Sequence, residues 1–310
     1  MAEPSIDRVI GSYGEPGEPG PLVVAICAVH GNELAGADAA RRVLAWLEAT
    51  RPAFRGRFLA LTGNVAAARA GRRGLDGDLN RRWLAERVTA IRGGGWAPRD
   101  AEDVEQAALL AVLDEALAMA RGPVLGLDLH SFSAPGPPFF VTRASGPELA
   151  FSAELRVPVI TSLERYIRGT ILELFIDEDL PVLGFEAGRH DDPRTVHAHA
   201  AVIRLALAEL GAVAHESLPD EAGDRALLAS LGEGLPPVVE VVHRHHIEPE
   251  DGFVMRPGYH NLVRVLRGEH LADDRRGLVV APRDAWLLMP LYQGSGEDGF
   301  FLAAERPFHG

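Results

Sequence analysis

The motif His30-Gly31-Asn32-Glu33 brings two metal-binding types of side chain together within one short segment. Imidazole nitrogen and carboxylate oxygen are both good ligands for Zn²⁺, and side chains three residues apart across a tight turn can point toward one spot. Glycine at position 31 permits such a turn. The same residues also fit a simpler interpretation, in which Glu33 begins a helix and His30 is the polar end of a strand. The motif alone leaves both interpretations open.

A third candidate ligand, His130, follows Asp128 and Leu129 at the end of another apolar stretch. A catalytic zinc site needs three protein ligands and one open coordination position for water. Because His30, Glu33 and His130 supply such a set, we predict that they hold one Zn²⁺ per chain. Asp128 alternates with His130 along the expected strand, and it is either structural or in contact with the ligands from behind.

A carboxylate that could act as a general base stands at Glu186, where the apolar segment PVLGFE ends. Beside a metal, such a group can take the proton of an activated water molecule. A glutamate at a strand end is, however, more often an ordinary surface residue.

The loop of residues 63–82 is rich in arginine and contains Arg73, Asn80 and Arg81. The planar guanidinium group can bind a carboxylate through two parallel hydrogen bonds, so this loop is a candidate for holding an acidic substrate. The alternative is a solvated basic loop, in which Arg81 pairs with an acidic neighbour of the same loop.

Alternating strands and helices are expected to position these residues. The sequence predicts strands over residues 21–29, 58–62, 124–130 and 181–186, and helices over 33–47, 100–120 and 193–210. His30, His130 and Glu186 then all lie at the carboxyl ends of strands, the edge at which open α/β sheets bind ligands. On the last helix, His197 and His199 are expected to be partly exposed.

The order of these elements predicts the class α/β, with a three-layer domain around a mostly parallel sheet over residues 1–212. Near residue 212 the pattern changes to short strands separated by Gly, Pro and Asp, apart from one short helix at 222–232. The segment 213–310 is therefore predicted to form a small C-terminal all-β domain.

Composition excludes several functional classes. The formal net charge of −13, from 31 basic and 44 acidic residues, argues against nucleic acid and anionic membranes as partners. All basic residues are arginine, so mechanisms that need a lysine amine are excluded. The single cysteine, Cys27, cannot form an intrachain disulfide. Residues 1–20 have no signal-peptide pattern, and we expect a cytoplasmic protein. Assembly into a homo-oligomer is left open.

Four motifs occur in order along the chain: HGNE at 30–33, GN at 63–64 with GDLNR downstream, DLH at 128–130, and FEAG at 185–188. Together they resemble the succinylglutamate desuccinylase/aspartoacylase family of zinc-dependent acyl-amino-acid hydrolases, which belong to the carboxypeptidase A-like metallohydrolases. The segments FVMRPGYHNLVRVLRGEHLA and LLMPLYQGSGEDGFF look like that family's C-terminal β-domain. The resemblance therefore covers nearly the whole chain.

The resemblance implies a role for each candidate residue. The zinc ligands would be His30, Glu33 and His130, and the general base would be Glu186. Arg73 would polarise the scissile carbonyl, while Asn80 and Arg81 would bind a substrate carboxylate. One position departs from the pattern, because the aspartoacylases have a carboxylate-binding arginine where this chain has Ile176. Arg165, Arg168 and Arg189 are the candidates for replacing it.

The expected activity is hydrolysis of the amide bond of a small, carboxylate-bearing N-acyl amino acid, with Glu186 as base for a metal-activated water. One alternative is a metallocarboxypeptidase that acts on peptide C-termini, since carboxypeptidases share this zinc set. The resemblance favours small substrates, because the β-domain of that family narrows access to the site. Another alternative is a catalytically silent metal-binding or interaction protein.

Overall fold

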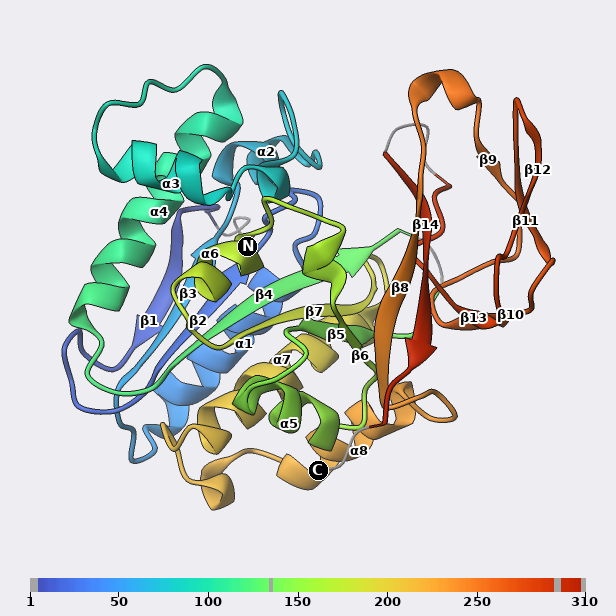
Figure 1. The fold of residues 1–310 in the computed structure, drawn as a ribbon. Helices are drawn as coiled ribbons and strands as arrows, with labels where there is room; N and C mark the ends of the chain where they lie inside the picture. The colour runs from blue at the N-terminus through green and yellow to red at the C-terminus, as the bar shows by residue number, and fades with distance from the viewer. Residues whose placement is uncertain (1–4, 134–135, 293–296, 308–310) are drawn as a thin grey trace.

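One large sheet runs through the structure, a computed structural model that describes residues 5–133, 136–292 and 297–307 (Figure 1). Its strands lie in the spatial order β1 (Val9–Tyr13), β3 (Arg57–Thr62), β2 (Leu22–Cys27), β4 (Val124–Phe132), β7 (Val182–Arg189), β5 (Phe139–Thr142), β6 (Val159–Thr161), β8 (Val238–His246), β14 (Asp298–Glu305), β13 (Ala285–Leu288) and β10 (Val263–Val265). A second sheet has the order β12 (Gly277–Val280), β11 (His270–Asp274) and β9 (Val254–Met255).

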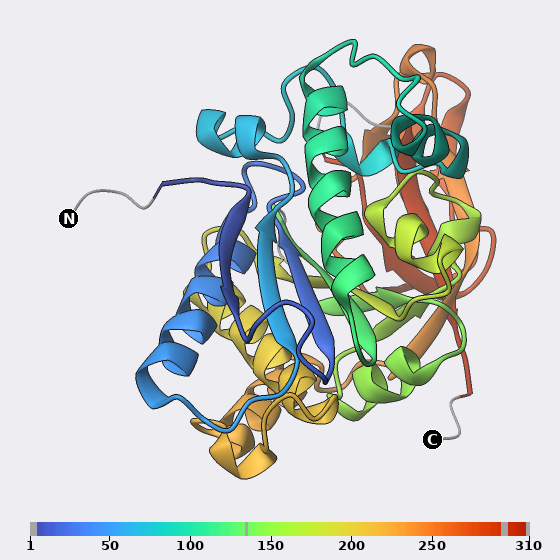
Figure 2. The same ribbon diagram turned by 90° about the vertical axis from the view of Figure 1, so that its left-hand side faces the viewer.

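Helices cover both faces of the first half of the large sheet, as Figure 2 shows for α1 and α4. The helices are α1 (Ala35–Thr50), α2 (Val65–Ala70), α3 (Ala85–Arg92), α4 (Ala101–Met119), α5 (Pro147–Glu154), α6 (Ile171–Asp177), α7 (Pro193–Glu209) and α8 (Glu221–Leu231). On one face, α1 and α7 pack in one apolar core, and on the other face α4 and α6 pack in another.

Strand β2 explains how one apolar segment can supply both cores. Successive side chains of a strand point to opposite faces. Val23, Ala25 and Cys27 accordingly belong to the core under α1 and α7. Leu22, Val24 and Ile26 belong to the core under α4. The prediction of a mixed α/β fold with a strand buried on both faces is confirmed.

The central strands are parallel, which brings their carboxyl ends to one edge. Strands β3, β2, β4 and β7 pair in parallel, while β1 at the edge and β5 beside β7 run antiparallel. Aspartate side chains cap two of the helices: Asp100 accepts the Asp103 N–H ahead of α4, and Asp192 accepts the Arg194 N–H ahead of α7. Short elements such as β5, β6 and α6 were not predicted, because they carry too few residues to display a periodic pattern.

The C-terminal strands continue the large sheet instead of starting a detached one. Strand β8 pairs in parallel with β6 and antiparallel with β14, and β13 and β10 follow. Val213, Leu218 and Leu228 pack in the core of α1 and α7. A boundary at residue 212 between two separate domains therefore stays a prediction. Within the described residues, no helix combines the length and the apolar character needed to cross a membrane.

Candidate active site

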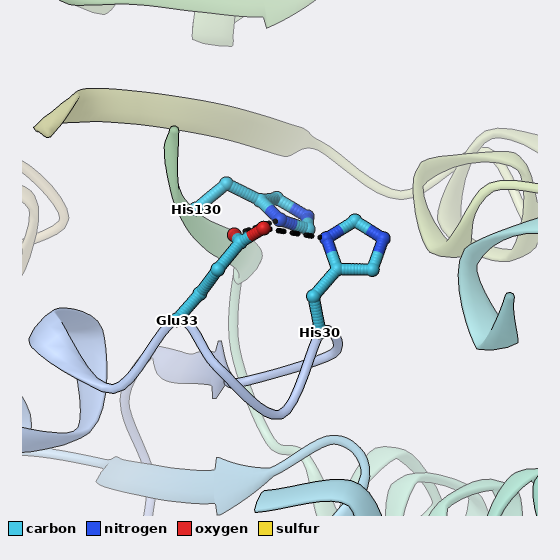
Figure 3. Close-up of side chains that lie close together, drawn as sticks. All are labelled: His30, Glu33 and His130. Carbon is cyan, nitrogen blue, oxygen red and sulfur yellow. Dashed lines mark hydrogen bonds and ion pairs between the residues drawn. The ribbon is translucent and has the colours of Figure 1, made fainter. Parts of the chain in front are cut away.

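Three candidate ligands meet at the carboxyl ends of β2 and β4 (Figure 3). The Glu33 carboxylate lies between two imidazole rings, with Oε1 at 2.9 Å from His30 Nδ1 and Oε2 at 3.0 Å from His130 Nδ1. The two ring centroids are 5.0 Å apart, and one donor atom from each of the three residues lies within 4.8 Å of the others. All three side chains are buried. The sequence prediction that these residues converge is confirmed.

A second carboxylate stands behind each histidine. His30 Nε2 lies 3.2 Å from Asp78 Oδ1, and His130 Nε2 lies 2.9 Å from Asp128 Oδ2. A carboxylate close to Nε2 favours the proton on that nitrogen, which leaves the Nδ1 lone pair for a metal. Of the two roles left open for Asp128, the geometry favours contact with a ligand.

The charges of this cluster stabilise one another. Burial opposes the cationic form of His130, but Asp128 and Glu33 outweigh it and raise the pKa of this imidazole well above its usual range. Burial likewise opposes the charged form of Glu33, and the two imidazoles hold the pKa of that carboxyl well below its usual range. In the metal-free protein these carboxylates therefore favour the protonated, positively charged form of His130.

Gly31 is required by a close approach of two segments. A Cβ atom at this position would lie 2.2 Å from the Ala67 carbonyl carbon and the Ala68 nitrogen in α2. The backbone N–H of Gly31 donates to the Arg73 carbonyl at 3.1 Å. From the sequence, glycine is expected here because it permits a tight turn. The stronger requirement for glycine is that the arginine-rich loop 63–82 packs directly against the turn of residues 30–33.

Glu186 lies beside the ligands because it is the direct partner of His130 in the parallel pairing of β7 with β4. Its Oε2 atom is buried without a hydrogen-bond partner among the described residues. Burial raises the pKa of Glu186 to about 7, while the positive charge of His130 opposes this shift. A carboxylate with a free oxygen and a pKa near neutrality has the properties of a general base.

The arginine loop reaches the cluster through Arg73 and Asp78. Arg73 Nη2 donates to Asp78 Oδ2 at 3.0 Å, and its Nη1 lies 3.5 Å from Glu33 Oε1. Burial opposes the charge of Asp78, but His30 and Arg73 hold the pKa of Asp78 below its usual range. Asp78 therefore joins a ligand to the arginine, a role that the sequence interpretation did not assign. Its place two residues before Asn80 in GDLNR was the available signal.

Asn80 and Arg81 follow in a short 3₁₀ turn, residues 79–81. Asn80 Oδ1 accepts the Ile171 N–H at 2.8 Å, which turns its Nδ2 toward the cluster, 3.4 Å from His130 Nε2. Arg81 Nη1 donates to the Asn80 carbonyl at 2.8 Å. Within the described residues Arg81 has no carboxylate partner, so the alternative in which an acidic neighbour in the loop neutralises it is not observed.

Glu102 holds the loop from the first turn of α4. Its carboxylate accepts the backbone N–H groups of Leu75 at 2.6 Å and Asp76 at 2.9 Å, and the Asn64 amide at 3.3 Å. The Glu102 side chain is fully buried. Because a loop of this kind cannot satisfy these N–H groups by itself, the helix fixes the path of the backbone that carries Asp78 and Asn80.

Three further residues border the ligands and were not predicted as part of the site. The Ser131 N–H donates to Glu33 Oε2 at 3.0 Å, and Ser131 Oγ lies 2.7 Å from His190 Nδ1. His199 Nε2 donates to the His130 carbonyl at 3.1 Å. The prediction that His199 is partly exposed was wrong: its exposed fraction is 0%, and burial lowers its pKa to about 4.

The arginines considered for a second carboxylate contact already have acidic partners. Arg165 lies 3.3 Å from Glu240, Arg168 lies 2.5 Å from Glu173, and Arg189 lies 2.7 Å from Asp191. Ile176 packs against the apolar core under α4. Each of these three arginines therefore has an acidic partner, whereas Arg81 has none among the described residues.

Comparison with known proteins agrees with this geometry. Residues 19–135 match the model of the Succinylglutamate desuccinylase/Aspartoacylase catalytic domain, a segment that contains the three candidate ligands and the arginine-rich loop 63–82. No curated protein matches the chain in sequence.

Solved structures match over most of the chain. The succinylglutamate desuccinylase from Chromobacterium violaceum is 17% identical, with 96% of this chain and 88% of that chain covered at a TM-score of 0.67. The product-bound Ectoine utilization protein EutE (DoeB) from Ruegeria pomeroyi is 18% identical, with 93% and 85% covered and a TM-score of 0.62. An aspartoacylase family protein from Mesorhizobium loti is 19% identical, with 96% and 88% covered and a TM-score of 0.62. At these identities the structures establish a shared fold. In sequence, residues 19–135 are similar to the catalytic domain of the succinylglutamate desuccinylase/aspartoacylase family.

Proposed function

We propose that the protein is a zinc-dependent amidohydrolase that cleaves the amide bond of a small N-acyl amino acid. The observation that carries this proposal is the buried oxygen of Glu186, which has no hydrogen-bond partner among the described residues, beside a cluster of two imidazoles and one carboxylate. Two nitrogen donors and one oxygen donor form a set that suits a catalytic Zn²⁺. The carboxylates behind His30 and His130 support the same assignment, because they leave the Nδ1 atoms free to bind.

When bound, Zn²⁺ would supply a positive charge that polarises the substrate carbonyl and lowers the pKa of water to near 7. Glu186 takes one proton from the attacking water through its free oxygen and delivers it to the leaving nitrogen. The hydroxyl oxygen of the water forms a bond to the acyl carbon as the carbon–nitrogen bond breaks. The products are a carboxylic acid and an amino acid.

Arg73 and the adjoining loop give the substrate its orientation. The Arg73 guanidinium lies next to Glu33 and is partly exposed, so it can donate to the oxygen on which negative charge develops. Loss of one such donor typically costs about 10²–10³ in rate. Asn80 Nδ2 and Arg81 bind the carboxylate of the amino acid, since the asparagine amide is already turned inward and the arginine has no acidic partner in the described chain.

The test is a panel of formyl, acetyl and succinyl amino acids offered to the purified protein after loading with Zn²⁺. We expect release of the free amino acid from at least one member, loss of turnover after chelation, and recovery when Zn²⁺ is restored. Faster release of the last residue from peptides would instead favour the metallocarboxypeptidase alternative. Stoichiometric metal binding without turnover of any compound would favour a silent metal-binding protein.

A further inference from the structure

His190 lies just beyond the end of β7, where the pairing with β4 is irregular. His130 pairs with Glu186, but Phe132 pairs with Arg189, so the β7 side contains one extra residue. Gly188 within this bulge has a φ of +128°, a conformation that favours glycine. Bulges at the end of a strand commonly redirect a side chain next to an active site. Here the residue that directly follows the bulged segment is a histidine.

Two contacts fix His190 against the strand that carries a ligand. Its backbone N–H donates to the Phe132 carbonyl at 3.1 Å, and its Nδ1 lies 2.7 Å from the Ser131 hydroxyl. Ser131 is buried and donates its own backbone N–H to Glu33 Oε2. Ser131 therefore connects the His190 ring to the carboxylate of Glu33, a candidate ligand.

The surroundings leave the second ring nitrogen available. Within the described residues, Nδ1 is the ring nitrogen of His190 that has a hydrogen-bond partner, and the side chain is partly exposed. Burial lowers the pKa of His190 below its usual range, which favours the neutral form of the ring. The charged groups that act on it come mainly from the site itself: Glu33, Arg73, Asp191 and His30. A neutral imidazole at this place can bind a ligand without opposing a metal.

We infer that His190 is a substrate-binding residue whose Nε2 forms a hydrogen bond with the acyl part of the substrate. This inference rests on the proposed function, in which Asn80 and Arg81 hold the carboxylate of the amino acid. His190 comes from a different strand end and has no anion-binding charge, so it suits the remaining polar part of the molecule. Ser131 orients the ring by engaging Nδ1.

Two variants separate substrate binding from a purely structural role. In His190→Gln, the side-chain amide reaches the place of Nε2 but not that of Nδ1. In His190→Asn, the amide reaches the place of Nδ1, where it can keep the contact with Ser131, but nothing occupies the place of Nε2. His190→Ala removes both groups, and His197→Gln, an exposed histidine on α7, is the matched control.

The measurements are kcat and KM with the acyl-amino-acid panel, together with zinc content and the unfolding midpoint of every variant. We expect His190→Ala to lower kcat/KM by about 10-fold to 100-fold, the range for one lost hydrogen bond to a buried group, with zinc content unchanged. His190→Gln should retain more activity than His190→Asn, and the ratio of kcat/KM between acetyl and succinyl substrates should change. The control should match the wild type.

The inference is overturned if His190→Ala keeps kcat/KM within about 3-fold of an active wild type, or if His190→Gln does not exceed His190→Asn. Loss of zinc or of a cooperative unfolding transition in all three variants would also overturn it, because the role would then be structural. If the wild type hydrolyses no member of the panel, the proposed function itself fails, and this result is distinct from the others.

Discussion

His130 and Glu186 are direct partners across the parallel strands β4 and β7. A candidate metal ligand and the candidate base are therefore held in register by backbone hydrogen bonds, not by a loop. Because side chains alternate along a strand, a slip of one residue would send Glu186 to the opposite face of the sheet. The sheet thus supplies the precision that proton transfer needs.

The first prediction concerns Glu186→Gln, which is nearly isosteric but cannot accept a proton. We expect turnover to fall by at least about 10²–10⁴-fold, the usual contribution of general-base catalysis, while zinc content stays at the wild-type level. The measurements are kcat on the best acyl-amino-acid substrate and metal content by atomic emission. A variant that keeps most of its kcat would remove Glu186 from the base role. A variant that loses zinc would make Glu186 a ligand.

A second prediction concerns the pH dependence of stability in the metal-free protein. Burial raises the pKa of Glu186 from 4.5 to about 7. Between these values the unfolded chain has already lost the proton that the folded chain retains, so this group lowers the free energy of unfolding as the pH rises from about 4.5 to 7. Metal-free Glu186→Gln should therefore have a higher Tm than the metal-free wild type at pH 8. The difference should close near pH 4.5, and the same difference at both pH values would contradict the burial argument.

Metal uptake provides a third prediction. In the metal-free protein the pKa of His130 is raised well above its usual range and that of His30 is also raised, because Glu33 and the backing aspartates outweigh burial. Zinc binds only the neutral imidazole, so binding must release protons at pH 7 and become tighter as the pH rises. Calorimetric titration in two buffers with different ionisation enthalpies measures this release. Identical apparent enthalpies would mean that the rings are already neutral. His130→Ala, which lacks one ligand, is the control for binding elsewhere.

The strand ends were predictable from the sequence because parallel strands impose a simple rule. A strand that is buried on both faces is recognisable in the sequence as a continuous apolar run. The residue that follows such a run must lie at the carboxyl edge of the sheet. His30, His130 and Glu186 each follow such a run, and the structure places them side by side. The long helices were equally visible, since α4 and α7 have recognisable caps and several turns of periodic sequence.

Contacts that depend on distant backbone could not be predicted. His199 stands among alanines in a helix that is buried around most of its circumference, so no polar face distinguishes it. Its role depends on the position of the His130 carbonyl, which is set by the packing of α7 on the sheet. The pairing of β8 with β6 is likewise non-local, which is why the C-terminal strands were predicted as separate from the sheet that they extend.

A fourth prediction follows from the contacts of Glu102 with the arginine loop. In Glu102→Gln, one of the two acceptor positions becomes an N–H₂ group that faces a backbone N–H, so a buried donor loses its partner. We expect the free energy of unfolding to fall by about 1–3 kcal/mol. KM should rise more than kcat falls, because Asn80 and Arg81 lose a fixed position while Glu186 does not. Glu115→Gln, an exposed residue on the same helix, is the matched control. If Glu102→Gln and Glu115→Gln change kcat and KM by the same factors, Glu102 does not specifically fix the position of the loop.

The last prediction is that Arg81 makes the enzyme require a free carboxylate on its substrate. The chain has a net charge of −13, yet Arg81 pairs with no acidic group among the described residues and donates to the Asn80 carbonyl. The nearby Asp78 accepts a hydrogen bond from Arg73. A guanidinium with no carboxylate partner among the described residues, in the loop that contacts the candidate metal ligands, favours a bound group that carries the opposite charge. Arg81→Ala should therefore lower kcat/KM by about 1.5–3 kcal/mol, the value for a hydrogen bond to a charged group, when the substrate is the free acid. With the corresponding amide the loss should shrink greatly, because that interaction is absent already.

Arg72→Ala removes an equal charge from an exposed neighbour in the same loop and should affect the two substrates alike. If Arg81→Ala also reduces the acid and the amide equally, Arg81 is a structural residue and the carboxylate must bind elsewhere.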